Sequence, residues 1–151
     1  MKRKKIIRII LISLLIVIAG FAFYAYKEFN RKQKDLTGMR PEFTVSAVDF
    51  IKEFGINEKA VNKKYQDKVI EVNGIVKESI KDEKGFCTIV LGDTLAMSSV
   101  RCSMDSMHNG GFKNILKGNN LSIKGICTGY NADELLGADI ILNRGVISNK
   151  N

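Results

Sequence analysis

The stretch Lys64-Tyr-Gln-Asp-Lys-Val-Ile-Glu-Val-Asn-Gly-Ile-Val-Lys-Glu-Ser-Ile80 decides the fold of this chain. Its alternating β-branched residues indicate a strand, whereas Asn-Gly in the middle is a strong signal for a two-residue hairpin turn. A second stretch has the same frame, because Val72-Asn-Gly-Ile-Val76 and Ile123-Lys-Gly-Ile-Cys127 both read apolar, polar, Gly, Ile, apolar. Lys-Gly makes a poor hairpin turn, so we interpret Gly74 and Gly125 as bends inside two long strands.

Three further strands are predicted around these two. They span residues 86–91, 95–104 and 138–147, and an irregular connection at 105–117 follows the third strand in the chain. Strongly bent strands with interior glycines are what a small closed barrel needs, because one strand must serve both halves of the sheet. The sequence therefore predicts a mainly β fold, a five-stranded OB-fold barrel. The alternatives are another small antiparallel barrel and an open α+β sheet.

Two short helices are predicted before the barrel. Ser46 and Asp49 fit a capping box at the start of a helix over 46–54, and Asn57 caps a second helix over 58–65. The apolar residues of the first helix recur at i, i+3, i+4 and i+7, so one of its faces needs a partner. The barrel strands supply that partner.

An apolar segment of 18 uncharged residues, 9–26, lies near the N-terminus. As a helix it would span roughly 27 Å, close to the thickness of a hydrocarbon core. It predicts an uncleaved transmembrane helix, with a cleaved signal peptide and a buried core helix as alternatives. The expected organisation is a cytoplasmic tail and transmembrane helix at 1–26, a basic spacer at 27–43, and an OB-fold domain with a helical lead-in at 44–151.

The net charge of +8 is confined to the residues that flank this segment. Residues 1–40 hold ten Lys/Arg against two acids, and residues 41–151 hold fourteen of each. A short tail with five positive charges would have to cross against the membrane potential, whereas long downstream domains translocate largely regardless of charge. We therefore expect a single-pass protein of the cell membrane, with its N-terminus in the cytoplasm and its C-terminal domain extracytoplasmic.

Several short motifs resemble the tRNA-anticodon-like OB-fold family. They are Asn57-Glu-Lys-Ala60, Tyr65-x-x-Lys68, the strand through Gly74, Lys77, Cys102, Gly118 and Gly125-x-Cys127-x-Gly129, within about residues 44–147. The resemblance implies a small bacterial OB-fold domain behind a membrane or export segment. It implies neither a tRNA activity nor any catalytic residue.

Six polar or amphipathic residues are the candidates for ligand contact: Tyr65, Lys68, Lys77, Arg101, Lys124 and Tyr130. Tyr65, where the helices meet the barrel, is favoured as a packing residue, and Tyr130 has the better claim to a ligand. Gly74 and Gly125 are assigned structural roles. OB-folds that bind single strands use basic grooves and exposed aromatic residues. The second and third predicted strands hold one aromatic and one basic residue, which disfavours nucleic acid as a partner.

The residues that often carry chemistry show no catalytic or metal-binding pattern. Cys87, Cys102 and Cys127 lack C-x-x-C spacing and lie in apolar strands, which favours buried thiols, although one disulfide is conceivable outside the cytoplasm. His108 is the single histidine and is expected on the surface. We therefore expect no cofactor, no metal and no enzymatic activity.

The function predicted from these observations is a membrane-anchored, extracytoplasmic OB-fold binding module. Its expected partners are the lipid bilayer and a peptide, glycan or protein. The alternative is a membrane-tethered protein that binds single-stranded nucleic acid.

Overall fold

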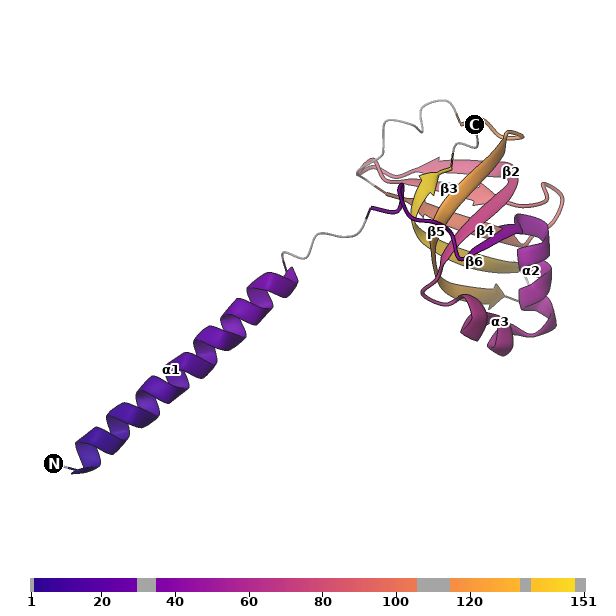
Figure 1. Ribbon diagram of the computed structural model, residues 1–151. Coiled ribbons are helices and arrows are strands. Elements are labelled where there is room, and N and C mark those ends of the chain that lie inside the picture. Colours follow the sequence, from indigo (N-terminus) through magenta and orange to yellow (C-terminus); the bar gives the residue numbers. More distant parts are fainter. Residues whose placement is uncertain (1, 30–34, 106–114, 134–136, 149–151) are drawn as a thin grey trace. The chain divides into compact units, whose positions relative to one another are not determined.

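The computed structural model describes residues 2–29, 35–105, 115–133 and 137–148, and the chain divides into two compact units at residues 34 and 35 (Figure 1). The first unit is a single helix, α1 (Lys2–Phe29). Its stretch Ile12–Phe29 has a mean hydropathy of 1.5 and no buried residue, so α1 is long and apolar enough to cross a bilayer. An uncleaved anchor and a signal sequence share these properties.

The stretch that decides the fold is one strand, β2 (Val69–Lys81). Its first half pairs antiparallel with β5 (Asn120–Asp133), from Val69 opposite Ile126 to Ile75 opposite Asn120. Its second half, from Val76 onward, pairs antiparallel with β3 (Cys87–Leu91). The strand changes partner just after Gly74, so Asn73-Gly74 is a bend and not a hairpin tip.

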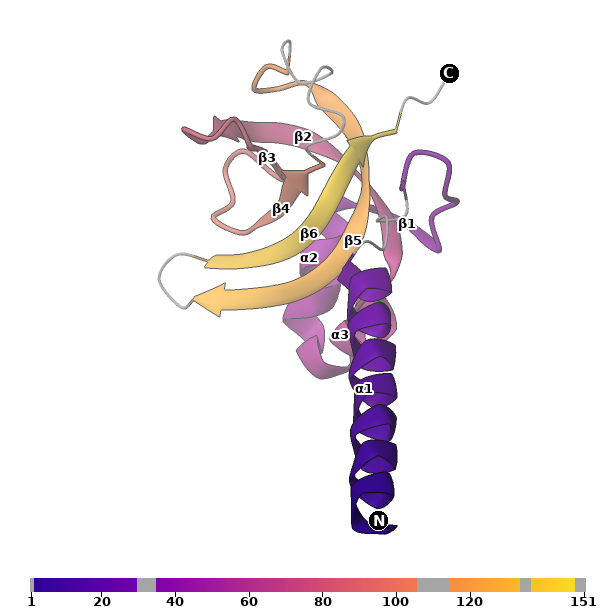
Figure 2. The ribbon, with the colours of Figure 1, turned by 90° about the vertical axis from the view of Figure 1, so that its left-hand side faces the viewer.

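The remaining pairings close a barrel (Figure 2). Strand β3 pairs antiparallel with β4 (Ser99–Met104), which pairs parallel with β6 (Gly137–Ile147). Strand β6 pairs antiparallel with β5, and β5 returns to β2. A five-stranded closed barrel with this order is an OB-fold, so the predicted fold class is confirmed.

A sixth strand, β1 (Phe43–Ser46), was missed in the sequence analysis. It pairs parallel with the first half of β2, with Phe43 opposite Ile70, and leads directly into α2 (Ala47–Ile56). The four residues show too little alternation to be recognised alone, and their partner lies more than twenty residues away in the chain.

Both predicted helices are present. In α2, the Ser46 hydroxyl accepts a hydrogen bond from the Asp49 N–H at 3.0 Å. In α3 (Glu58–Tyr65), the Asn57 side chain accepts from the Ala60 N–H at 3.1 Å. Both caps satisfy backbone donors that the first helical turn leaves unpaired. The two helices share one hydrophobic core with the barrel strands, through side chains such as Phe50 on α2.

The strand predicted at 95–104 begins only at Ser99, so its first part was wrong. Residues 93–98 form a loop, in which the Asp93 carboxylate accepts from the Leu95 N–H at 2.9 Å. The Lys77 ammonium donates to the carbonyls of Ala96 at 2.6 Å and Ser98 at 3.1 Å. These side-chain bonds take backbone groups that a ladder would need, and Leu95 is left 93% exposed.

Both bends of the repeated frame depend on close approach. A Cβ atom on Gly74 would lie 2.8 Å from the Cβ of Ala47, and one on Gly125 would lie 3.2 Å from the Cβ of Leu142. Contacts under 3.0 Å force something to shift, so the demand for glycine is stricter at the first bend. It is stricter because there the strand passes directly beneath α2.

Residues 35–42, which we call the strap, pack on the barrel although they were expected in the spacer. Leu36 is 1% exposed and lies in a small apolar cluster with Val69 and Val146. The Lys124 ammonium donates to the carbonyls of Thr37 at 3.0 Å and Met39 at 2.7 Å. The compact unit accordingly begins at residue 35. His108, and residues 106–114 of the irregular connection with it, lie outside the described residues.

Candidate ligand-binding surface

Two of the four basic candidates bind backbone carbonyls of the same domain. Lys77 holds the loop at 93–98 and Lys124 holds the strap, each through two hydrogen bonds. A lysine ammonium has three hydrogen-bond donors, and each of these two side chains uses two of its donors within the fold. Lys124 is also buried. Both residues are therefore structural cations in this arrangement.

The other two basic candidates bind carboxylates. The Lys68 ammonium lies 3.0 Å from Glu42, and the Arg101 Nε lies 2.6 Å from Asp139. Asp139 also accepts a hydrogen bond from the Ser99 hydroxyl. The Lys68 pair is exposed and the Arg101 pair is partly exposed, so each contributes little to stability, but each reduces the local positive potential.

The tyrosine candidates pack against the helices. Tyr65 is 1% exposed, and its hydroxyl donates to Glu53 at 3.0 Å while its ring meets Phe50 edge-on at 5.0 Å. Burial raises the pKa of the Tyr65 phenol. Tyr130 is half-buried, and its ring stacks on Phe54 with centroids 4.7 Å apart. Tyr65 is thus inaccessible to a ligand, and Tyr130 already uses one ring face.

The outer face of β3 and β4, where OB-folds often bind oligonucleotides, is nearly uncharged. Thr88 lies opposite Ser103, and Val90 lies opposite Arg101. Arg101 is the one exposed cation on these two strands, and it is paired with Asp139. This face presents hydroxyls and one neutralised ion pair.

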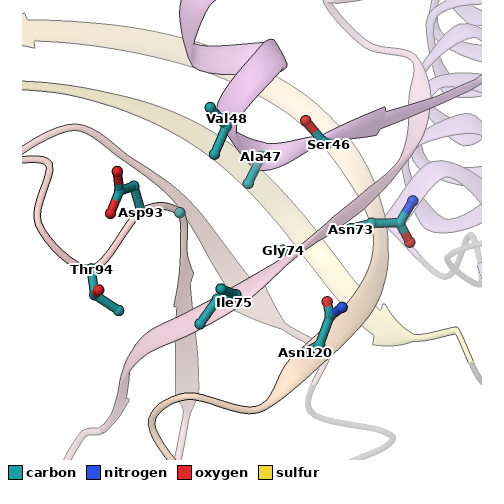
Figure 3. A pocket seen from close by; sticks show the side chains of 10 residues that line it. Ser46, Ala47, Val48, Asn73, Gly74, Ile75, Asp93, Thr94 and Asn120 are labelled. Atoms are coloured by element: carbon teal, nitrogen blue, oxygen red, sulfur yellow. The ribbon is translucent and has the colours of Figure 1, made fainter.

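A pocket of about 400 Å³ opens elsewhere, where α2 begins above the bend in β2 (Figure 3). The start of α2, the bend of β2, the turn after β3 and the start of β5 form its walls. Its size lies within the roughly 300–1,000 Å³ typical of small-ligand pockets. We call this cavity the α2 pocket. Its side chains include Val48, Asn73, Ile75, Asp93, Thr94 and Asn120.

The polar lining of the α2 pocket keeps its hydrogen-bonding capacity. Within the described part of the chain, the side-chain amides of Asn73 and Asn120 form no hydrogen bond, and neither does the Thr94 hydroxyl. Asp93 is the one ionisable residue in the lining. None of the six candidates from the sequence lines this pocket. The single local signal was Asn73 beside the bend, and the other walls come from distant parts of the chain.

The three cysteines are buried free thiols. Burial raises the pKa of Cys102 to about 12 and that of Cys127 to about 11. The reactive form of cysteine is the thiolate, so these two thiols are held in the unreactive form at neutral pH. Among the described residues, no three His, Cys, Asp or Glu side chains are placed to hold a metal ion.

Comparison with known proteins supports the fold. A family model described as tRNA_anti-like matches residues 1–141. A solved protein from Klebsiella pneumoniae, named as a nucleic acid-binding lipoprotein, is 14% identical. The match covers 78% of this chain and 100% of that one, with a TM-score of 0.55. This likeness shows a common fold.

Two synthetases match more weakly. A Leishmania major protein named as an aspartyl-tRNA synthetase is 9% identical over 83% of this chain and 25% of its own, with a TM-score of 0.43. Asparaginyl-tRNA synthetase from Pyrococcus horikoshii is 15% identical over 56% of this chain and 20% of its own, with a TM-score of 0.37. No curated protein matches the sequence.

Proposed function

This chain belongs to the tRNA_anti-like family, and from that premise we propose that it is a membrane-anchored, extracytoplasmic OB-fold module that binds a peptide, glycan or protein and catalyses no reaction. The anchor is α1, and the binding surface belongs to the unit that begins at residue 35. In this proposal, residues 1–26 comprise the cytoplasmic tail and transmembrane helix, and a basic linker joins them to the domain.

The observation that carries the proposal is the engagement of the candidate cations. Lys68, Lys77, Arg101 and Lys124 all have partners inside the domain. Nucleic-acid affinity comes largely from lysines and arginines that neutralise phosphates, and these four are already neutralised or hydrogen-bonded. The α2 pocket adds one carboxylate and no cation. An uncharged or basic ligand suits this surface better than a polyanion.

A role without catalysis is supported by the state of the thiols. Cys102 and Cys127 are buried with raised pKa values, so the strongest potential nucleophiles of the domain are protonated and enclosed. The polar groups of the α2 pocket that have no partner among the described residues are amides and a hydroxyl, which bind ligands without exchanging protons near neutral pH.

Binding of single-stranded nucleic acid is the second candidate. The observation that favours it is the description of the Klebsiella pneumoniae lipoprotein as nucleic-acid-binding. Fold alone does not transfer a function, since OB-folds serve many ligands. The nucleic-acid function requires a basic track, and the four candidate cations that could contribute to one are already engaged within the domain.

Titration of labelled oligothymidylate with the full chain in nanodiscs separates the two candidates. We expect no saturable binding, even at low salt where contacts with phosphates are strongest. Saturable binding that weakens steeply as salt rises would establish the nucleic-acid function in place of ours.

Sidedness is tested with a membrane-impermeant maleimide on intact cells. The native thiols are buried, so Glu83→Cys, on the exposed tip between β2 and β3, supplies the reactive group. We expect this variant to react before lysis and the matched Lys4→Cys variant to react only after lysis. The reverse pattern would place the domain in the cytoplasm.

A further inference from the structure

We infer that the α2 pocket is a binding site for a short extended peptide segment that carries an apolar side chain beside a neutral or basic residue. The inference rests on the proposed function, since it assigns that function a site and one of its ligand classes. Four properties of the pocket support it: two side-chain amides on paired strands without partners among the described residues, apolar walls, the sign of its charge, and access.

The two amides occupy diagonal positions on paired strands. Asn73 and Ile75 share one face of β2, because side chains two apart on a strand point the same way, and Asn120 on β5 lies opposite Ile75. Figure 3 shows the two amides on neighbouring strands around the bend. A diagonal pair of this kind is about 7 Å apart, close to the two-residue repeat of an extended chain.

A carboxamide is well suited to a peptide backbone. It presents one acceptor and two donors, so it can pair with both the C=O and the N–H of a peptide group. The amides of Asn73 and Asn120 have no partner among the described residues, so binding would not break an internal hydrogen bond. A peptide spanning both would satisfy them together.

Aliphatic side chains form part of the pocket wall. Val48 on α2 is 41% exposed and Ile75 on β2 is 45% exposed, although both lie beside buried core residues. Gly74 and Gly92 line the same cavity without side chains to fill it. An apolar ligand side chain placed there would remove Val48 and Ile75 from water, whereas a ligand that carries only hydroxyl groups would not.

The charge of the pocket disfavours anions. Asp93 is the one ionisable lining residue, and Asp49 lies in the first turn of α2. The Ser46 hydroxyl caps the Asp49 N–H, and the Asp49 carboxylate accepts from that hydroxyl at 2.6 Å, so the positive end of the helix dipole is already compensated. Charge complementarity with the pocket therefore favours a neutral or basic peptide over an acidic one.

The strap does not cover this site. The strap ends where β1 begins, and α2 follows the other end of β1, so the strap and the α2 pocket lie at opposite ends of that strand. Figures 1 and 2 both place the strap and α2 on different sides of the barrel.

The test uses the side-chain amide resonances of Asn73 and Asn120, observed by NMR in the full chain in nanodiscs. The probes are acetyl-leucyl-lysyl-leucinamide, its glutamyl counterpart, chitotriose and oligothymidylate, each at millimolar concentration. We expect the lysyl peptide to shift both resonances saturably and the glutamyl peptide to bind more weakly. Asn120→Ala should weaken the lysyl peptide about fivefold, the value of one hydrogen bond. Asn131→Ala, the same residue type exposed on the same strand, should leave it unchanged.

Each other outcome has a definite meaning. Shifts with chitotriose and not with the peptides would overturn the peptide site but leave a module for uncharged ligands. Salt-sensitive shifts with oligothymidylate would overturn both the site and the proposed function. An absence of shifts with every probe would overturn the site alone, because sidedness and oligonucleotide binding test the function separately.

Discussion

The two copies of the repeated frame lie on paired strands, yet their polar side chains have different roles. In the first copy the polar residue before the glycine is Asn73, whose amide has no hydrogen-bond partner among the described residues and lines the α2 pocket. In the second copy it is Lys124, whose ammonium is buried and holds the strap. Both copies need a glycine because each strand must bend. The polar side chains differ, because Lys124 is hydrogen-bonded within the fold and Asn73 has no partner among the described residues. A sequence pattern can thus predict a bend without predicting what the bend is used for.

The largest effect should come from the glycines themselves. We expect Gly74→Ala to lower the free energy of unfolding by about 2–3 kcal/mol, because the new Cβ would lie 2.8 Å from that of Ala47. Gly125→Ala, with contacts at 3.2 Å, should cost about 1 kcal/mol. Denaturant unfolding measures both.

Adding Ala47→Gly to Gly74→Ala removes the clashing atom and should recover much of the loss. If the double variant is less stable than the sum of the two single changes implies, the close approach to α2 is not the reason for the glycine.

The polar residues of the two copies should differ next. Lys124→Met leaves the carbonyls of Thr37 and Met39 without their donor, and we expect a loss of about 1–3 kcal/mol and faster proteolysis at Arg40 in the strap. Asn73→Ala should change stability by less than about 0.5 kcal/mol, because within the part of the chain that the structure describes its amide has no partner to lose. Equal losses at the two positions would erase the distinction between them.

The last residue differs between the two copies, and this difference predicts how the stability of the protein depends on pH. Cys127 stands where the first copy has Val76, and its pKa is raised to about 11 by burial. The folded state holds this proton more tightly than the unfolded state. The contribution of the Cys127 thiol to stability is therefore fully present below about pH 9 and is lost as the pH rises toward 11. We expect Cys127→Val to reduce the slope over this window by about 1 kcal/mol per pH unit.

Cys102, with a pKa raised to about 12, contributes to the slope over the same window in both proteins, so the difference between them reports on Cys127. An unchanged slope between pH 9 and 11 would show that Cys127 is not the group that titrates.

The smallest effect should come from the exposed ion pair on the face of β3 and β4. Arg101→Gln removes the pair with Asp139, and we expect a loss of under about 1 kcal/mol. Lys68→Gln, which removes the pair with Glu42, is its matched control outside that face. A selective loss of oligonucleotide binding in the first variant would assign this face to nucleic acid.

Local signals in the sequence predicted much of the fold. The caps at Ser46 and Asn57 lie within three residues of the groups they satisfy, and the glycine frames mark the bends, so the helices and the two long strands were predicted correctly. Strand β1 and the loop at 93–98 were missed, because a parallel pairing and a lysine that reaches two distant carbonyls are interactions far apart in the chain.

The candidate site was harder to predict for the same reason. Cations look available in a sequence until their partners are known, and the partners of Lys77 and Lys124 are carbonyls, which every residue carries. The α2 pocket draws its walls from four separate elements. Only the position of Asn73 beside a bend could have pointed to it.

The strap has a mechanical consequence. A pull on the chain from its N-terminal side reaches Leu36 and the carbonyls held by Lys124 before it reaches any barrel strand. These contacts would therefore break first. The eight residues of the strap, which are about 27 Å long when fully extended, would then straighten before force reached β1. Under tension the strap would therefore detach while the barrel strands stayed paired.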